Sequence, residues 1–293
     1  MTPQPLQSLG VDVGVTKGLD LVLLDEERRP LECRRRVRVE ELGPALVELR
    51  PDVVAIDAPP AWGTGGGSRL TERELRRFGI QSYGTPSDPR KGENTFYSWM
   101  KVGFAVFACA GESGYARYAS GPVRGTAIEV FPHASAVVLA GCLPPPEVNK
   151  RAFREDVLRA QGVPVDGLRS PDQVDAALAA LTGLLALGGR RTHLGDPKEG
   201  VIVLPSATLP ARPYRRCQRE RQAGRKDGEA QLHFPGLARC ACGDPACRAS
   251  TAREFAPGHD AKRKSALWSL ARSGQEAVDE LRRRGWELPP EMR

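Results

Sequence analysis

The chain has 293 residues, 40% of them hydrophobic, which is enough for a packed core and excludes global disorder. The formal net charge of +7 permits binding to a polyanion without requiring it. The longest apolar run, residues 176–189, is too short to span a bilayer, and residues 1–10 lack the pattern of a signal peptide. We therefore expect a cytoplasmic protein with no membrane partner and with reduced thiols, Cys109 and Cys142 lying in the core.

The first part of the chain predicts a small sheet. Residues 9–15, 19–25 and 32–39 are β-rich runs whose short spacers suit hairpins. Residues 41–49 have helical spacing and end before a proline, and residues 52–56 form a fourth β-rich run. Three meandering strands followed by a helical crossover predict a mixed sheet in which the first and fourth strands are neighbours.

The remainder divides into more helices and two further segments. The patterns predict helices at residues 71–78, 96–110 and 150–161, a helix capped by Ser170, and strands at 127–131 and 201–204. A charged, low-complexity stretch follows. The sequence thus predicts an α/β domain over residues 1–205, a basic linker over 206–231 and a small Cys/His module over 232–293.

Acidic residues interrupt the apolar strands of the predicted domain. Asp12 lies inside the first strand, and Asp57 ends the fourth. A buried carboxylate is costly unless a partner neutralises it, and Mg²⁺ is one such partner. Asp172 and Asp175, three apart on one helix, and Glu129, in a strand, are further candidates. Each of three acids also has a structural alternative. Asp12 could accept hydrogen bonds from the following turn, Asp172 could stabilise the helix dipole, and Glu129 could form an ion pair.

These acids stand in segments whose order and spacing carry a resemblance. The segments are Gly10-Val11-Asp12-Val13-Gly14, Ile56-Asp57-Ala58-Pro59, Arg69-Leu70-Thr71-Glu72-Arg73-Glu74-Leu75-Arg76, Ile128-Glu129-Val130-Phe131-Pro132 and Asp172-Gln173-Val174-Asp175-Ala176. From residue 9 to residue 205 they resemble the predicted ribonuclease-H-like nucleases grouped as domain-of-unknown-function family 429. The last segment is also similar to a helix of RuvC-type junction resolvases.

The resemblance implies a ribonuclease-H-like mixed β-sheet flanked by helices, with Asp12, Asp57 and Asp175 as ligands of Mg²⁺ or Mn²⁺. It implies two-metal hydrolysis of phosphodiester bonds in DNA or RNA. Glu129 and Asp172 stay further catalytic candidates on the pattern of the residues alone. Three basic residues near the loop after the fourth strand can contact phosphates, with solvated surface charge as the alternative for each of them. They are Arg69, Arg76 and Lys91.

Two other functions stay open. Residues 12–17 also resemble the phosphate loop of actin-like kinases, which would make the protein a nucleotide phosphotransferase. That architecture uses two such domains, and the sequence shows no second copy before residue 205. The third hypothesis, after the nuclease and the phosphotransferase, is a non-catalytic nucleic-acid-binding module on the same fold. Metal-dependent cleavage, ATP turnover or neither would discriminate the three.

The C-terminal module concentrates metal-ligand residues. Cys240, Cys242 and Cys247 lie within eight residues around a glycine-proline turn, and His259 follows twelve residues later. Three cysteines and one histidine make a tetrahedral structural Zn²⁺ site, whose metal would supply the folding energy of so small a module. His233 is the competing fourth ligand, and free thiols are the alternative.

Overall fold

The structure is a computed structural model that describes residues 5–65, 67–88 and 94–217. The first elements are β1 (Gln7–Gly14), β2 (Gly18–Asp25), β3 (Pro30–Val37), α1 (Val39–Leu49) and β4 (Val53–Asp57). They are followed by α2 (Leu70–Arg77), η2 (Thr95–Tyr97), α3 (Ser98–Glu112), β5 (Ala116–Arg117), β6 (Thr126–Glu129), α4 (Pro132–Ala140), α5 (Lys150–Ala160), α6 (Pro171–Leu187), β7 (Thr192–Asp196) and β8 (Gly200–Leu204). The chain divides into two compact units, residues 1–159 with 163–236 and residues 160–162 with 237–293. The predicted domain bounds stay a prediction.

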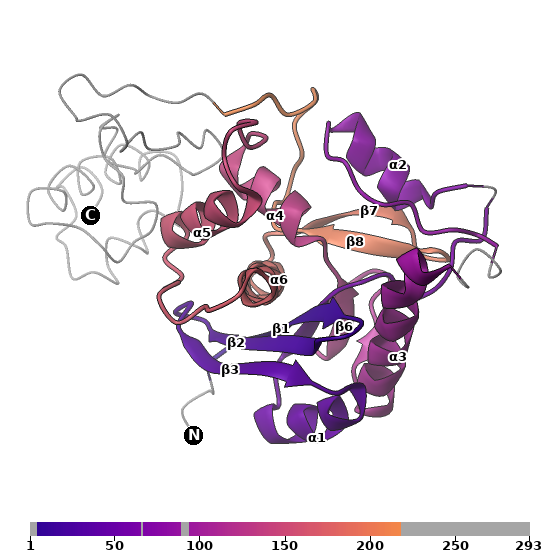
Figure 1. Ribbon diagram of the computed structural model, residues 1–293, viewed down its shortest axis with the longest axis vertical. Coiled ribbons are helices and arrows are strands. Elements are labelled where there is room, and N and C mark those ends of the chain that lie inside the picture. Colours follow the sequence, from indigo (N-terminus) through magenta and orange to yellow (C-terminus); the bar gives the residue numbers. More distant parts are fainter. Residues whose placement is uncertain (1–4, 66, 89–93, 218–293) are drawn as a thin grey trace, which may run out of the picture. The chain divides into compact units, whose positions relative to one another are not determined.

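One mixed sheet organises the first unit (Figure 1). Its strand order is β3-β2-β1-β4-β6-β8-β7, with β5 paired to β6. The pairs β1–β2 and β2–β3 are antiparallel, whereas β4 runs parallel to β1, and β6 parallel to β4. The predicted mixed sheet is confirmed, and so is the prediction that the first and fourth strands are neighbours.

The two faces of β1 meet different helices. Leu9 and Val11 point into an apolar cluster that also contains side chains of α1 and α3. Because successive side chains of a strand alternate, Gly10 and Asp12 point to the opposite face, where α6 lies. A Cβ atom on Gly10 would overlap the carbonyl oxygen of Ala176, so only glycine permits this close approach. Asp12 therefore faces α6.

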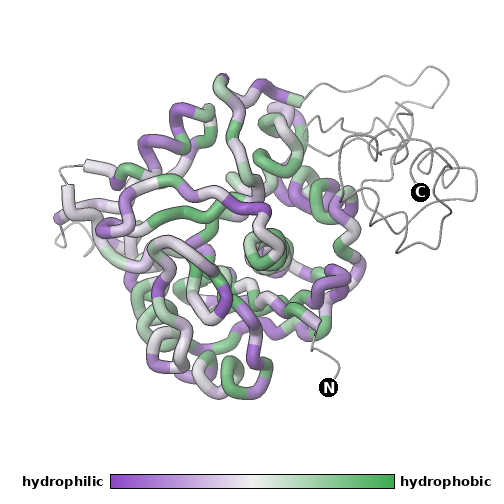
Figure 2. The backbone as a smooth tube through the Cα atoms, turned by 180° about the vertical axis from the view of Figure 1, so that it is seen from behind, coloured by the Kyte–Doolittle hydropathy of each residue, from purple (hydrophilic) through white to green (hydrophobic). Residues whose placement is uncertain are grey.

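Helix α6 lies on the face of the sheet opposite to α1 and α3 (Figure 1). As predicted, Ser170 caps it, accepting a hydrogen bond from the backbone N–H of Gln173 at 3.1 Å. Every residue from Gln173 to Ala186 is buried except Asp175, and Figure 2 shows this central helix mostly in the hydrophobic colour. Among the described residues, no helix is long and apolar enough to cross a membrane.

Besides the short elements η2 and β5, helix α4 and strand β7 were not predicted from the sequence. The predicted strand 127–131 ends at Glu129, and α4 starts three residues later at Pro132. Helix α4 has apolar residues on all sides and is almost wholly buried, so it lacks the polar stripe that gives a surface helix its period. Strand β7 pairs antiparallel with β8 at the sheet edge, and its partly exposed sequence has no clear alternation.

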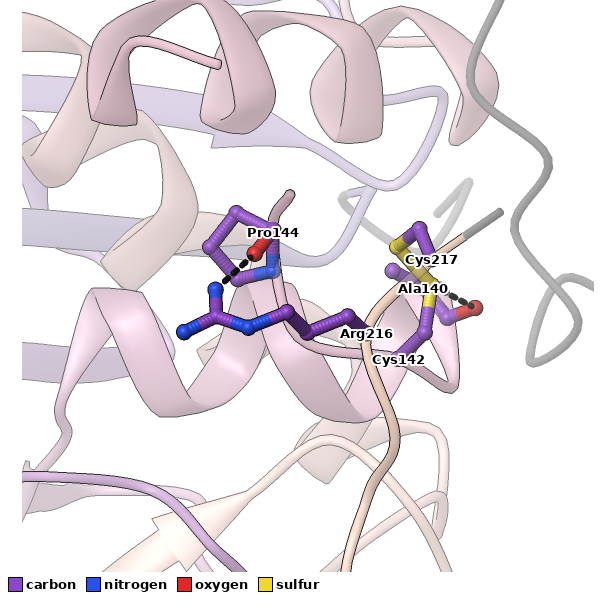
Figure 3. The surroundings of a disulfide bond; sticks show 5 residues. All are labelled: Ala140, Cys142, Pro144, Arg216 and Cys217. Atoms are coloured by element: carbon purple, nitrogen blue, oxygen red, sulfur yellow. Dashed lines mark hydrogen bonds between the residues drawn. A yellow bond between two sulfur atoms is a disulfide. The ribbon is translucent and has the colours of Figure 1, made fainter. Parts of the chain in front are cut away.

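The expectation of reduced thiols is wrong for two cysteines. Cys142 and Cys217 form a disulfide, with their Cα atoms 5.1 Å apart (Figure 3). The backbone reinforces the pairing, because the Leu143 N–H donates to the Arg215 carbonyl and the Cys217 N–H donates to the Leu143 carbonyl, both at 2.8 Å. Cys142 is buried, as predicted. The start of the predicted linker is thus fixed to the segment after α4, and residues 218–231 lie outside the described ones.

Candidate metal site

Three aspartates from three elements converge at one point of the fold. Asp12 belongs to β1, Asp57 ends β4, and Asp175 lies in the second turn of α6. One carboxylate oxygen from each lies within 4.8 Å of the others. These are the three residues that the sequence assigned to Mg²⁺ or Mn²⁺.

The local structure explains why they meet. Asp12 and Asp57 are register partners in the parallel ladder of β1 and β4, so their side chains leave the sheet on the same face. Asp175 directly precedes Ala176, the residue whose carbonyl lies against Gly10. The close approach of α6 at Gly10 therefore brings the third carboxylate to the first two.

The electrostatics of the cluster disfavour three negative charges. Burial, followed by the charges of Asp57 and Asp175, raises the pKa of Asp12 to about 9. Burial and the charge of Asp175 also raise the pKa of Asp57 well above its ordinary value. Burial raises the pKa of Asp175 to about 6, against the opposing effect of Arg154. A set of carboxylate oxygens that repel one another fits a hard divalent cation such as Mg²⁺ or Mn²⁺.

Arg154 is a residue of this site that the sequence did not reveal. Its Nη1 group, from α5, donates to both carboxylate oxygens of Asp175 at 2.5 Å. Both side chains are only 15% exposed, so the pair is well shielded from solvent. Arg154 is one of several basic residues on an amphipathic helix, and nothing in its local pattern distinguishes it from its neighbours.

His133, at the start of α4, lies near the same arginine. Burial, together with the charges of Arg154 and Lys150, lowers the pKa of His133 to about 4, so its ring is neutral near pH 7. Its Nδ1 atom is buried and has no hydrogen-bond partner among the described residues. We assign His133 no role at this site.

The two further acidic candidates lie outside the cluster. Glu129 is buried, and its two oxygens accept hydrogen bonds from the Arg69 guanidinium at 2.9 and 2.6 Å. Asp172 accepts from Lys17 at 3.2 Å, in the first turn of α6. Both contacts are consistent with the structural alternatives that the sequence left open, an ion pair for Glu129 and a helix N-terminus for Asp172.

The predicted phosphate-binding residues differ in their surroundings. Arg69 is buried, and besides Glu129 its guanidinium binds Glu72 at 3.0 Å, so its charge is already paired with two carboxylates of the fold. Arg76 is exposed and donates to the Ser68 hydroxyl at 2.6 Å. Lys91 lies outside the described residues. So do the predicted zinc ligands, which are Cys240, Cys242, Cys247 and His259 with the competing His233.

Comparison with known proteins gives a family and two distant structural likenesses. The family model described as "Protein of unknown function (DUF429)" matches residues 10–199. The RuvC structure of Thermus thermophilus aligns at 16% identity with a TM-score of 0.36, covering 63% of this chain and 97% of that chain. T. thermophilus RuvC in complex with a Holliday junction substrate aligns at 18% identity with a TM-score of 0.38, covering 63% and 96%. No curated protein matches the sequence.

Proposed function

The chain belongs to the DUF429 family of proteins of unknown function, and we propose that its converging aspartates make it a metal-dependent nuclease. The observation that supports this is the placement of three carboxylate oxygens within 4.8 Å of one another. The proposed reaction is hydrolysis of phosphodiester bonds in DNA or RNA.

Each aspartate would have a defined part. Asp12 and Asp57, fixed by hydrogen-bonded strands, would hold the ions from the sheet, and Asp175 would complete the site from α6. When bound, a pair of Mg²⁺ or Mn²⁺ ions supplies an activated water and stabilises the leaving oxygen. Arg154 holds the Asp175 carboxylate in place through both oxygens, which orients it for the ions.

The wider setting is part of the proposal. Nucleic acid is the expected partner, and the net charge of +7 favours its approach. We keep a cytoplasmic location as an expectation. A structural zinc ion would be bound by Cys240, Cys242, Cys247 and His259, and elemental analysis of protein purified without chelator would test for it.

A cleavage assay tests the proposal. Wild-type protein with Mg²⁺ or Mn²⁺ is expected to cut at least one member of a panel of DNA and RNA substrates. Asp12→Asn and Asp57→Asn are expected to abolish cutting, whereas Asp156→Asn, which changes a surface acid paired with Arg159 on α5, keeps it. ATP turnover without cleavage would instead indicate a phosphotransferase, and nucleic-acid binding with neither reaction a binding module.

A further inference from the structure

A cavity of about 210 Å³ lies beside the proposed metal site, and Asp57 forms part of its wall. The rest of the wall is largely apolar and aromatic, including Val13, Tyr83, Trp99 and Phe131. Its volume is below the roughly 300 Å³ at which pockets for drug-sized ligands begin. The cavity therefore suits one planar ring system held next to the carboxylates.

The polar side of this cavity is tightly organised. Arg69 bridges two carboxylates of the wall, and Glu72 accepts further hydrogen bonds from the Thr85 N–H and hydroxyl groups at 2.9 and 2.5 Å. These buried bonds hold the segment after β4 in one conformation. The Ser82 hydroxyl also lines the cavity, is buried, and has no partner among the described residues. It is available to the edge of a bound ring.

An exposed aromatic cluster continues from the cavity to the surface. Tyr83, which lines the cavity, is 67% exposed, and Phe96 is 49% exposed. Their ring centroids are 5.2 Å apart, and Phe96 lies 5.0 Å from the ring of Tyr97. Single exposed apolar side chains are common, whereas neighbouring ones that form a continuous patch are typical of binding surfaces.

We propose that the cavity holds one unpaired base of a nucleic-acid strand and that Tyr83 and Phe96 stack against neighbouring bases. This inference rests on the proposed nuclease function and names its substrate, single-stranded or locally unpaired DNA or RNA. Aromatic side chains bind single strands because every base has a π-face, and those faces are covered in a duplex. A pocket of this size can receive a base only after the base has left the stack.

Binding without cleavage tests the inference. Full-length protein in chelator is titrated with a short strand that carries 2-aminopurine, either single or annealed to its complement, in DNA and RNA forms. The single strand is expected to bind more tightly and to change its fluorescence. Tyr83→Ala and Phe96→Ala are expected to raise the Kd roughly 5- to 150-fold, the equivalent of the stacking of one base. Phe96→Trp should keep the affinity.

Two further variants sharpen the result. Val47→Ala removes an apolar side chain on α1 that is 65% exposed and away from the cavity, and it should leave the Kd unchanged. Ser82→Leu fills the cavity and should remove the 2-aminopurine response, with folding checked by circular dichroism. Because Tyr83 and Phe96 are exposed, their variants are expected to fold.

Equal or tighter binding of the duplex, or aromatic variants that bind like wild type, would overturn the inference. Such a result alongside metal-dependent cleavage would leave the nuclease proposal intact. A single-strand preference that depends on Tyr83 and Phe96, in a protein that cuts nothing with either metal, would instead contradict the nuclease proposal alone.

Discussion

Asp12 and Asp57 stand directly opposite each other in the parallel ladder of β1 and β4, with their side chains on the face that α6 covers. Two half-buried carboxylates at adjoining positions repel unless a cation or protons neutralise them. The backbone ladder keeps them together despite this repulsion, which is the arrangement expected of a site selected for a ligand rather than for stability.

The first prediction concerns this repulsion. Asp57→Asn is expected to stabilise the metal-free protein by at least about 1 kcal/mol, because one pKa unit corresponds to about 1.4 kcal/mol and the pKa of Asp57 is raised well above its ordinary value. Mn²⁺ should raise the Tm of the wild type but not that of the variant. Thermal unfolding with chelator and with Mn²⁺ measures both effects. A variant less stable than wild type in chelator would show that Asp57 has a structural partner instead.

The second prediction concerns acid. Hydrogen bonds from the Leu70 and Thr64 N–H groups lower the pKa of Glu199 to about 2, so its ionised form stabilises the fold. This contribution is complete above the ordinary value near 4.5 and disappears as the pH falls towards 2. Glu199→Gln should lower the free energy of unfolding by about 1 kcal/mol at pH 7. Urea unfolding at several pH values should show the difference shrinking below pH 4.5, and a constant difference would contradict the account.

The third prediction separates structure from substrate binding. Removing Arg69 leaves Glu129 and Glu72 buried without their cation, so Arg69→Met should lower the free energy of unfolding by about 3–5 kcal/mol. Arg76→Ala, on the exposed face of the same helix region, should change it by less than about 0.5 kcal/mol. Urea denaturation measures both. If Arg69→Met were as stable as wild type, the ion pairs would contribute little to the free energy of unfolding. Such a result would favour a role for Arg69 in binding the substrate's phosphates instead.

The fourth prediction concerns the disulfide. Cys142 and Cys217 are 75 residues apart, and closing a loop of that length restricts the unfolded chain. Cys217→Ser, or reduction of the wild type, should lower the free energy of unfolding by about 2–4 kcal/mol. Cys33→Ser, which alters an exposed free thiol, is the matched control and should have no effect. Identical melting with and without reductant, and labelling of both thiols in native protein, would show that the bond does not form.

The sequence predicted the part of the site that depends on local patterns. A carboxylate that breaks an apolar strand is visible in the sequence, and the meander followed by a crossover places the first and fourth strands side by side. Asp175 was recognisable because it is the polar residue leading into an apolar helix.

Contacts between distant segments left no such signal. Arg154 and Asp175 are 21 residues apart on separate helices, and any of several arginines in α5 had the same local pattern. Cys142 and Cys217 pair across 75 residues, and cysteine spacing alone does not define a partner. Arg69 looked like a surface cation because its contact with Glu129, 60 residues along the chain, forms only in the folded protein.

The most direct test of the central claim is the position of metal in a crystal soaked with Mn²⁺. The account predicts anomalous density bonded to the carboxylates of Asp12 and Asp57, with Asp175 in reach of the same ions, and loss of that density in Asp12→Asn. A structure at saturating Mn²⁺ with no metal at these carboxylates would contradict it.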